Sequence, residues 1–373
     1  MKLSPTSNQF AVDASSRIGQ DAASMTIDRI LQAARKAGAS DVHLIAGLPP
    51  TFRVNGEILP MNADALTAAD AERLVREIVN ERQWAAYDSE WELCVSAHRD
   101  GIGRMRVSVY RHAGCAEAAI RLAHLEIPTS AQLGLPPVVD EMTRRASGLV
   151  LITGPTGAGK TTTLNYMVGL INREQRVKVV TIEDPVEYVH SPQKAVVVQQ
   201  EVHTDVVSYP RALRHVLRQD PNVIVIGEMR DLETIETALQ AAETGHLVIA
   251  TLHTPWADHT VERVVSVFPA EKQNLILAQL AGSLQGIVGQ LLLPRADRKG
   301  RVLANEVLIA NNAVRNLIRE GNPHMLGSVM QTSGREGMKP MDSSLQELYS
   351  RGIITWDVAT SHARSPGGFK KGT

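Results

Sequence analysis

The sequence GPTGAGKT at residues 154–161 constrains this chain more than any other segment. It follows directly after the apolar run GLVLIT at residues 148–153. A buried strand that runs into a glycine-rich turn and then into a helix is typical of the phosphate-binding loop of P-loop nucleotide hydrolases. The glycines let backbone N–H groups surround phosphate oxygens, and the positive end of the following helix attracts the same negative charge. The segment therefore predicts nucleotide binding, and the alternative is an ordinary glycine-rich turn.

The spacing within this loop predicts a role for each polar position. Lys160 is expected to reach the β- and γ-phosphates, and the Thr161 hydroxyl is expected to bind Mg²⁺. ATP or GTP is therefore the expected ligand, together with Mg²⁺. The other expected nucleotide-binding residues are Gly154, Pro155, Thr156, Gly157, Ala158, Gly159 and Thr162.

Length and composition bound the class of protein. A chain of 373 residues is expected to form about two domains, and 43% hydrophobic with 21% charged residues is typical of a soluble globular protein. The formal net charge of -1 gives no global argument for nucleic-acid binding. The two cysteines, Cys94 and Cys115, lie in no CxxC pair, so neither a disulfide framework nor a zinc site is expected. A reduced, cytosolic compartment follows as the expectation.

Membrane segments are not expected either. The first 16 residues are polar and lack the apolar core of a signal peptide. The longest apolar stretch, residues 275–293, is predicted to be an amphipathic or buried helix and not a membrane span. The polar residues that interrupt it are Gln279, Ser283, Gln285 and Gln290. Any role at a membrane is therefore expected to come through partners.

The first domain is predicted to be a small α+β domain over residues 25–122. The pattern predicts helices over residues 25–37 and 67–88, and short strands over residues 42–61 and 92–123. Thr67 and Asp70 are expected to form a capping box at the start of the second helix. The expected turns are Asn55-Gly56, Asp100-Gly101 and Ala113-Gly114.

The second domain is predicted over residues 138–365 and belongs to the α/β class. Near-continuous apolar runs alternate with helical patterns there, which is typical of a mostly parallel sheet with crossover helices. The runs are residues 148–154, 177–184, 222–228 and 246–253, with residues 301–309 as a fifth candidate. Beyond Asn311 the chain is predicted to be helical. The remaining segments are predicted to be a flexible extension (1–24), a linker (123–137) and a disordered tail (366–373).

Three polar side chains follow three of these apolar runs. Glu183, Glu228 and His253 each stand at the end of a predicted strand. Because such ends meet at one edge of a parallel sheet, all three are expected beside the phosphate loop, where nucleotide hydrolysis needs a carboxylate near Mg²⁺ and a group that polarises water. Taken singly, each has a simpler interpretation: Glu183 as a capping acid, Glu228 as an ion-pair partner of Arg230, and His253 as a buried histidine. Their joint placement favours the catalytic interpretation.

These motifs together resemble the ATPases of the type II/type IV secretion and pilus superfamily, over nearly all of residues 25–362. The resemblance includes the acidic box TIEDPVEY, the Walker B segment RQDPNVIVIGEMRDLETIETALQAAETGH and the histidine box ATLHT. Within the superfamily the chain is most similar to the retraction ATPases of type IV pili. ASDVHLIAGLPPTFRVNGEI and AVRNLIRE (residues 313–320) are typical of that group, and the two CxxC pairs usual in extension and type II secretion relatives are absent.

The resemblance implies a fold and site roles. It implies a PAS-like first domain and a RecA-like ATPase domain, with ATP and Mg²⁺ as ligands. Glu183 would orient the attacking water, and Glu228 would act on Mg²⁺ partly through water. His253 would sense the γ-phosphate or position the attacking water. Nucleotide is expected in the cleft between the two domains.

Arginines of the first domain are further candidates. Period-two alternation puts Arg104 and Arg106 on one strand face. The resemblance implies that Arg106 and Arg121, with Arg104 third, offset transition-state charge as arginine fingers; a solvated strand face is the alternative. Arg214 and Arg218 either assist or pair with neighbouring acids.

The resemblance also implies partners and a client. The chain would act as a homo-hexamer at the cytoplasmic face of the inner membrane, turn a membrane-embedded platform protein and retract a pilus. AVRNLIRE would couple hydrolysis to pilus removal, or form an ordinary amphipathic packing helix. The first rival is an assembly or secretion motor of a type II, conjugative or plasmid-encoded pilus system. A RecA-like nucleic-acid motor is disfavoured by 4% aromatic residues and near-neutral charge, and a non-hydrolysing scaffold by the presence of Glu183 and Glu228.

Overall fold

The computed structural model describes residues 25–54, 56–123, 126–298 and 300–369. The chain divides into two compact units, Met1–Leu125 and Glu126–Thr373, which are treated separately below. The predicted extension at residues 1–24, the predicted turn residue Asn55 and the end of the predicted tail lie outside the described residues.

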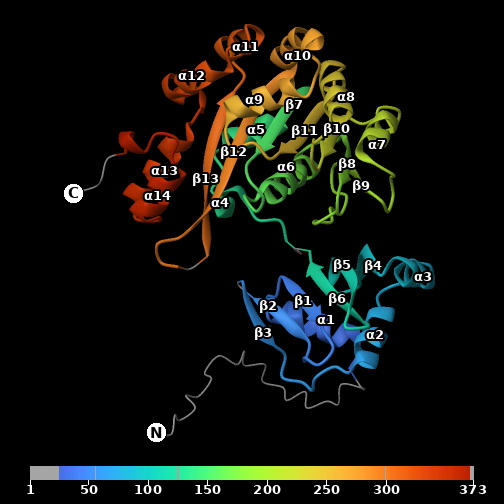
Figure 1. The fold of residues 1–373 in the computed structure, drawn as a ribbon. Helices are drawn as coiled ribbons and strands as arrows, with labels where there is room; N and C mark the ends of the chain where they lie inside the picture. Colours follow the sequence, from blue (N-terminus) through green and yellow to red (C-terminus); the bar gives the residue numbers. More distant parts are fainter. Residues whose placement is uncertain (1–24, 55, 124–125, 299, 370–373) are drawn as a thin grey trace, which may run out of the picture. The chain divides into compact units, whose positions relative to one another are not determined.

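The first unit is built on a six-stranded antiparallel sheet in the order β3-β2-β1-β6-β5-β4 (Figure 1). The strands are β1 (Asp41–Leu44), β2 (Thr51–Val54), β3 (Glu57–Pro60), β4 (Glu92–Arg99), β5 (Gly103–His112) and β6 (Cys115–Leu122). The helices are α1 (Ile27–Lys36), α2 (Ala68–Arg76) and α3 (Glu81–Glu90). Alternate strand residues such as Val42, Val107 and Ile120 are fully buried in one core with Ile30 and Leu74 of the helices. The α+β class predicted for this part of the chain is confirmed.

Capping side chains decide where the helices of this unit begin. Thr67 and Asp70 form the predicted capping box at the start of α2. A second capping box, formed by Asn80 and Gln83, starts α3. Because Asn80 adopts an extended backbone conformation to cap α3, the single helix predicted over residues 67–88 is in fact two helices.

The second unit contains a seven-stranded sheet in the order β13-β12-β7-β11-β10-β8-β9. All neighbours pair in parallel except β12 and β13, which are antiparallel. The strands are β7 (Gly148–Thr153), β8 (Lys178–Glu183), β9 (Val196–Glu201), β10 (Val223–Ile226), β11 (Leu247–Leu252), β12 (Leu284–Pro294) and β13 (Arg301–Ile309). The predicted mostly parallel α/β sheet is confirmed.

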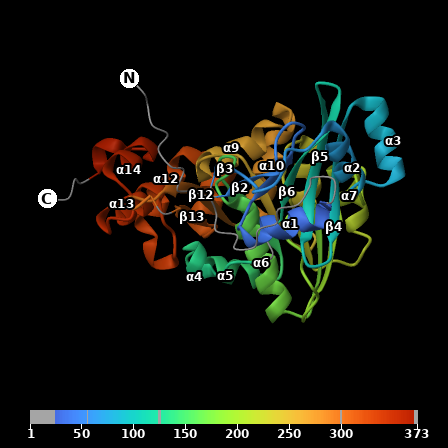
Figure 2. The ribbon, with the colours of Figure 1, turned by 90° about the horizontal axis from the view of Figure 1, so that it is seen from below.

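Helices cover both faces of this sheet. Because successive strand residues point to opposite faces, Leu149 and Leu151 pack with α7 to α11, whereas Val150 and Ile152 pack with α5 and α6. Figure 2 shows α13 and α14 gathered at the β13 end of this unit. The helices are α4 (Ser130–Leu133), α5 (Val138–Thr143), α6 (Lys160–Glu174), α7 (Tyr209–Val216), α8 (Leu232–Glu243), α9 (Ala257–Ser266), α10 (Ala270–Ser283), α11 (Asn312–Arg319), α12 (Leu326–Thr332), α13 (Met341–Ser350) and α14 (Trp356–His362). Short 3-10 helices lie at Pro323–Met325, Gly334–Glu336 and Pro366–Gly368.

Three segments differ from the sequence prediction. Residues 275–293 are not one helix, because α10 ends at Ser283 and the remainder forms β12 in the sheet. The predicted linker 123–137 contains the helix α4, which Thr129 caps and Gly134 ends in a left-handed conformation. In the predicted tail, the Phe369 ring contacts Trp356 with 6.4 Å between ring centroids.

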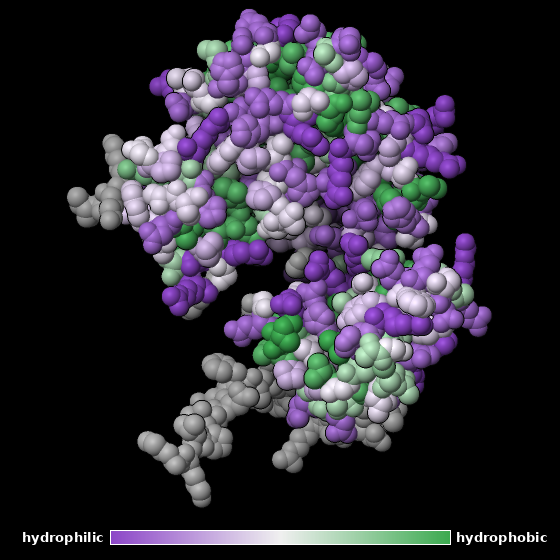
Figure 3. All heavy atoms as spheres, viewed as in Figure 1, coloured by the Kyte–Doolittle hydropathy of each residue, from purple (hydrophilic) through white to green (hydrophobic). Residues whose placement is uncertain are grey.

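The helices are short or polar by the standard of a lipid bilayer. None of those in the described ranges combines the length and the apolar character that crossing a membrane requires. Figure 3 shows one face of the molecule, on which hydrophilic residues interrupt the hydrophobic ones.

Candidate active site

The phosphate loop has the backbone that its glycines predict. Gly154, Gly157 and Gly159 all have positive φ angles, of 142°, 79° and 87°. A Cβ at Gly154 would lie only 2.3 Å from the backbone oxygen of Gln290 on β12. Glycine is therefore required at this position both for its conformation and for the close approach of the neighbouring strand. The loop ends at Gly159, which precedes the first residue of α6.

Lys160 lies at the start of α6 and is 8% exposed. Its Nζ donates hydrogen bonds to the carbonyl oxygens of Gly154 (2.8 Å) and Pro155 (3.0 Å) and lies 3.4 Å from His253 Nδ1. Burial lowers the pKa of Lys160, and the negative charge of Glu228 acts against that shift. The loop thus holds one partly desolvated cation, whose charge attracts anions.

The strand order brings the three predicted polar residues to one side of the loop. Reading outward from β7, the neighbouring strands are β11, β10 and β8, and their carboxyl ends lead to His253, Glu228 and Glu183. The Thr156 hydroxyl of the loop lies 3.5 Å from His253 Nδ1. The structure therefore places all three residues at the edge of the sheet that holds the phosphate loop.

Glu228 is held by two cationic or polar partners. Arg230 donates hydrogen bonds to both of its carboxylate oxygens, at 2.5 and 2.7 Å, and His253 Nε2 lies 2.9 Å from Oε1. Burial on its own would raise the pKa of Glu228, but the hydrogen bonds and charges of Arg230 and His253 outweigh it and lower the pKa. Glu228 is therefore an ionised carboxylate, and its pairing with Arg230 matches the simpler interpretation of the sequence.

Glu183 has the opposite environment. It is 3% exposed at the end of β8, and Thr181 Oγ1 and Gln199 Nε2 both donate hydrogen bonds to its Oε1, at 2.7 and 3.0 Å. Its Oε2 is buried, and Asn165 of α6 also acts on the carboxylate as a hydrogen-bond donor. Burial raises the pKa of Glu183, although the hydrogen bonds from Thr181 and Gln199 act to lower it. One of the two carboxylates of the site is thus stabilised in its charged form and the other is poised to take up a proton.

Three residues of this environment were not predicted from the sequence. Thr181 and Gln199 pair side by side on β8 and β9, but β9 was not predicted as a strand at all. Tyr209 lies at the start of α7, and a Cβ added at Gly227 would come within 2.8 Å of its hydroxyl. Burial, then Asp184, Glu183 and Glu228, raises the pKa of Tyr209, so the phenol stays protonated. The spacing of Thr181 and Glu183, two residues apart on one strand face, was the only available signal.

A cavity of about 630 Å³ opens beside the phosphate loop, on the β12 and β13 side. Ala158, Gly159, Thr162 and Thr163 of the loop and of α6 form one wall. The other walls come from α4, β12, β13 and α13 and include Gln132, Arg295, Arg301, Asn305, Lys339 and Glu347. The cavity and the three polar residues thus lie on opposite sides of β7, as the strand order requires.

The arginines of the first unit lie on the sheet face away from its core. Arg106 and Arg121 are cross-strand neighbours on β5 and β6, and both are exposed. Arg121 Nε donates to Asp41 Oδ1 at 2.9 Å, and Arg106 Nε lies 3.0 Å from Cys94 Sγ. Arg104 shares their face of β5. Because these residues and the phosphate loop belong to different units, the predicted role as arginine fingers stays a prediction.

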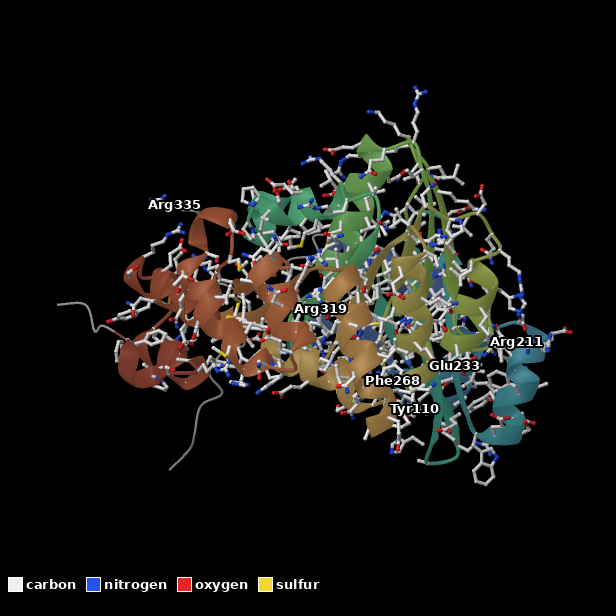
Figure 4. The ribbon with its side chains drawn as sticks, turned by 90° about the horizontal axis from the view of Figure 1, so that it is seen from above. Tyr110, Arg211, Glu233, Phe268, Arg319 and Arg335 are labelled. Carbon is white, nitrogen blue, oxygen red and sulfur yellow. The ribbon has the colours of Figure 1, made fainter. Side chains whose placement is uncertain are left out.

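Two other basic residues, Arg214 and Arg315, have structural partners. Arg214 of α7 forms an ion pair with Glu233, which lies at the start of α8 (Figure 4). In the AVRNLIRE segment, Arg315 donates to the carbonyl oxygens of Ala310, Ala281 and Gly282 at 2.9, 2.6 and 2.7 Å, so it caps the carboxyl end of α10.

Fold and site together define a P-loop nucleotide-binding protein with a carboxylate and histidine cluster at neighbouring strand tips. The profile described as type II/IV secretion system protein matches residues 18–356. The chain belongs to this family, as the sequence motifs predicted.

Individual members of the family show which of its proteins this chain is similar to. The chain is 41% identical over 345 residues to the protein named type IV pilus retractation ATPase PilT of Pseudomonas aeruginosa, a match that covers 92% of this chain and 100% of that protein. It is 40% identical over 321 residues to a twitching motility protein of Neisseria gonorrhoeae, covering 86% of each chain.

Solved structures agree with the sequence relatives. A crystal structure of the pilus retraction motor PilT with bound ADP has a TM-score of 0.87 at 42% identity, and the match covers 92% of this chain and 98% of that one. The Legionella pneumophila ATPase DotB has a TM-score of 0.77 at 28% identity, covering 90% and 95%. The predicted fold class and family are confirmed by these comparisons.

Proposed function

We propose that this chain is an ATP-hydrolysing motor that drives the retraction of a type IV pilus. The single observation that carries the chemistry is that His253 contacts both Lys160 of the phosphate loop and Glu228, while Glu183 ends another strand at the same edge of the sheet. The names of the relatives with 40% and 41% identity support pilus retraction as the process that the motor drives, since one is named a retraction ATPase and the other a twitching motility protein.

The two carboxylates fit different steps of ATP hydrolysis. Glu183 would orient a water molecule and take its proton as the water oxygen attacks the γ-phosphorus, while the bond from that phosphorus to the bridging oxygen breaks and ADP leaves. Its carboxylate would accept the proton in this step. Lys160 would balance the charge of the β- and γ-phosphates.

The cavity beside β12 and β13 supports an orientation for the nucleotide. The γ-phosphate would lie toward His253 and Glu228, so the nucleoside would extend to the other side of β7. The cavity lies there, and its volume is in the range of small-molecule sites, roughly 300–1,000 Å³. We therefore assign the base and ribose to this cavity.

The residues also fit Mg²⁺. The Thr161 hydroxyl and the Glu228 carboxylate are hard oxygen donors, which Mg²⁺ prefers. No cluster of three or more His, Cys, Asp or Glu side chains suited to a metal occurs in the described part of the chain, so water and phosphate oxygens would complete the coordination. Bound Mg²⁺ would neutralise phosphate charge as it develops.

The assembly and its partners follow from the family. We infer a ring of identical chains, a hexamer, that acts at the cytoplasmic face of the inner membrane on a platform protein of the pilus machinery. Arg106, Arg121 and Arg104 would complete the nucleotide site as arginine fingers, and the exposed positions of Arg106 and Arg121 are compatible with this role.

ATPase activity measured across size classes tests the proposal. Wild type should hydrolyse ATP as a large assembly, and Lys160→Ala should lose nucleotide binding. Glu183→Gln should bind ATP but hydrolyse it roughly 10²- to 10⁴-fold more slowly. A wild-type rate in either variant would refute the site.

The client is tested in cells. Deleting the gene of a retraction motor leaves excess surface pili, whereas deleting an assembly motor leaves none. If cells lack pili after the deletion, the protein is an assembly or secretion motor and not a retraction motor.

A further inference from the structure

We propose that Asn305 on β13 is a specificity-determining residue that selects adenine over bases with an oxygen at position 6. Its side-chain oxygen would accept a hydrogen bond from the 6-amino group of the base. This inference rests on the proposed function, because it requires the base of the nucleotide to enter the cavity beside the phosphate loop. Neither the motifs of the sequence nor the names of the relatives assign a role to Asn305.

Asn305 and the phosphate loop line the same cavity. One wall of this cavity, whose volume is about 630 Å³, includes Ala158 and Gly159 of the loop, and another includes Asn305. Gly159 directly precedes Lys160, the residue expected to contact the phosphates. A nucleotide bound to the loop therefore has Asn305 in the wall of the cavity to which its base is assigned.

The contacts of Asn305 leave one polar atom unused. The residue is 5% exposed, and its Nδ2 donates a hydrogen bond to the carbonyl oxygen of Gly134 at 3.1 Å. Turning the amide over would set its oxygen against that carbonyl oxygen, so Oδ1 is fixed as the unused acceptor. Oδ1 is buried without a hydrogen-bond partner among the described residues. A buried acceptor without a donor is costly, so we expect a ligand that donates to it.

The other side-chain oxygens that line the cavity already have donors. The Gln132 oxygen accepts from the backbone N–H and the hydroxyl of Thr129, at 2.9 and 3.0 Å. The Glu347 carboxylate accepts from Lys339 at 2.5 Å and from Arg351 at 3.5 Å. Each remaining hydroxyl of the lining accepts one hydrogen bond: Thr162 from Tyr188, Thr163 from Gln290, and Ser344 from the backbone N–H of Asn305. Among the described residues, Asn305 therefore supplies the side-chain oxygen of this lining that lacks a donor.

An acceptor at this place distinguishes purine bases. Adenine carries an amino group at position 6, which donates, whereas guanine and hypoxanthine carry an oxygen there, which accepts. A 6-oxo group would face Asn305 Oδ1 with a second acceptor and leave both oxygens without a donor. The base takes no part in the transfer of the phosphoryl group. Discrimination should therefore appear in KM and kcat/KM, with little change of kcat.

Hydrolysis of three nucleotides by the full chain tests the inference. ATP, purine riboside triphosphate and ITP carry an amino group, a hydrogen and an oxygen at position 6 of the base. We expect kcat/KM of wild type to be about 10- to 100-fold lower for ITP than for ATP, with the purine nucleotide between them. Equal use of ITP and ATP by wild type would overturn the inference, and this result does not depend on the folding of a variant.

Asn305→Leu removes the acceptor and keeps a side chain of similar size. In this variant the kcat/KM values for ATP and ITP should differ by no more than about threefold, mainly because KM for ATP rises, while kcat stays within about twofold of wild type. A purely structural role, through the contact with Gly134, would instead weaken all three substrates alike.

Asn172→Leu is the matched control. Asn172 is a buried asparagine in the last turn of α6, 2% exposed, and both of its amide atoms have partners in the protein. Nδ2 donates to the carbonyl oxygen of Ser191 at 2.8 Å, and Oδ1 accepts from the backbone N–H of Gln193 at 2.9 Å. This variant should keep the wild-type preference for ATP over ITP. An equal loss of preference in both variants would overturn the specific role of Asn305.

The same assays separate the inference from the proposed function. If wild type hydrolyses none of the three nucleotides, the proposed function fails. If wild type hydrolyses ATP, but its preference over ITP survives in Asn305→Leu, then only the role of Asn305 is overturned.

Discussion

His253 Nε2 lies 2.9 Å from Oε1 of Glu228. The other ring nitrogen, Nδ1, lies 3.4 Å from Lys160 Nζ. Because β11 lies between β10 and β7 in the sheet, one imidazole links the Walker B carboxylate to the lysine of the phosphate loop. We therefore expect His253 to respond to a ligand that binds beside the lysine and the carboxylate.

We expect His253→Asn to lower kcat about 10- to 100-fold while ADP affinity changes little, because the loop and its lysine remain intact. His246→Asn is the matched control, since His246 precedes the same strand and its Nδ1 lies 3.1 Å from the Ala241 carbonyl oxygen, away from the loop. Steady-state ATPase assays with an ADP titration measure both effects. An equal loss in both variants would contradict a specific role for His253.

Gly154→Ala should abolish nucleotide binding and destabilise the second unit by about 1–3 kcal/mol, because the added Cβ would meet the Gln290 backbone oxygen at 2.3 Å. Gly157→Ala is the control for conformation alone. Gly157 also has a positive φ, of 79°, but nothing lies within 4 Å of its added Cβ. Thermal unfolding with and without ADP measures the difference. Equal effects of the two substitutions would show that the contact with β12 is unimportant.

Arg315→Ala should lower the free energy of unfolding by about 1.5–3 kcal/mol, since Arg315 caps α10 through the carbonyl oxygens of Ala281 and Gly282 and also binds that of Ala310. Arg319→Ala should change it by no more than about 0.5 kcal/mol, because its hydrogen bond is an exposed contact with Asn316 on the same helix. Figure 4 labels Arg319 on this helix, α11. Denaturant unfolding tests both values.

The substitutions Arg315→Ala and Arg319→Ala also test whether the AVRNLIRE segment couples ATP hydrolysis to pilus removal. We expect Arg319→Ala to impair retraction in cells while leaving ATP turnover unchanged. If retraction survives both substitutions, the coupling role is wrong. A retraction defect confined to Arg315→Ala would reflect the lost helix cap.

The environment of Glu306 predicts that the free energy of unfolding depends on pH. Its carboxylate accepts hydrogen bonds from the backbone N–H groups of Ala257 at 2.8 Å and Met341 at 3.2 Å, at the starts of α9 and α13. Burial raises the pKa of Glu306 from 4.5 to about 7, while the two hydrogen bonds and Arg364 oppose that shift and Asp258 adds to it. A raised folded-state pKa means that the stabilising contribution is fully present below pH 4.5 and is lost as the pH rises through about 7.

The free energy of unfolding of wild type, relative to Glu306→Gln, should therefore fall by about 2 kcal/mol between about pH 5 and pH 8. Glu347→Gln is the contrasting control. The hydrogen bond from Lys339 lowers the pKa of the exposed Glu347, so the contribution of Glu347 is present above pH 4.5 and is lost only at lower pH. Chemical denaturation at several pH values measures both differences. A pH-independent difference for Glu306→Gln would contradict the burial argument.

The sequence predicted the phosphate loop and the buried parallel strands of the second unit, but it missed the strands β9 and β12. The phosphate loop and the tips at Glu183, Glu228 and His253 were accessible because fully buried parallel strands are continuous apolar runs, which stand out from their surroundings. β9 was missed because most of its residues are only partly buried and two glutamines follow its valines. β12 was missed because its apolar residues continue those of α10 without a break, and periodicity alone does not separate a buried helix from a buried strand.

The partners of Glu183 could not be predicted for a related reason. Gln199 meets Glu183 only through the parallel pairing of β8 and β9, in which residues 16 apart in the chain become neighbours. No local pattern encodes that register. Thr181, by contrast, lies on the same strand face as Glu183 and was within reach of an argument from alternation.

The distribution of thiols has a practical consequence. Cys94 and Cys115 are both free and both belong to the first unit, and the remaining sequence contains no cysteine. After Cys94→Ser, a fluorophore on Cys115 reports on that unit alone, and one engineered cysteine on an exposed helix of the second unit completes a donor–acceptor pair. Energy transfer between the two dyes would then test whether one unit moves against the other during turnover.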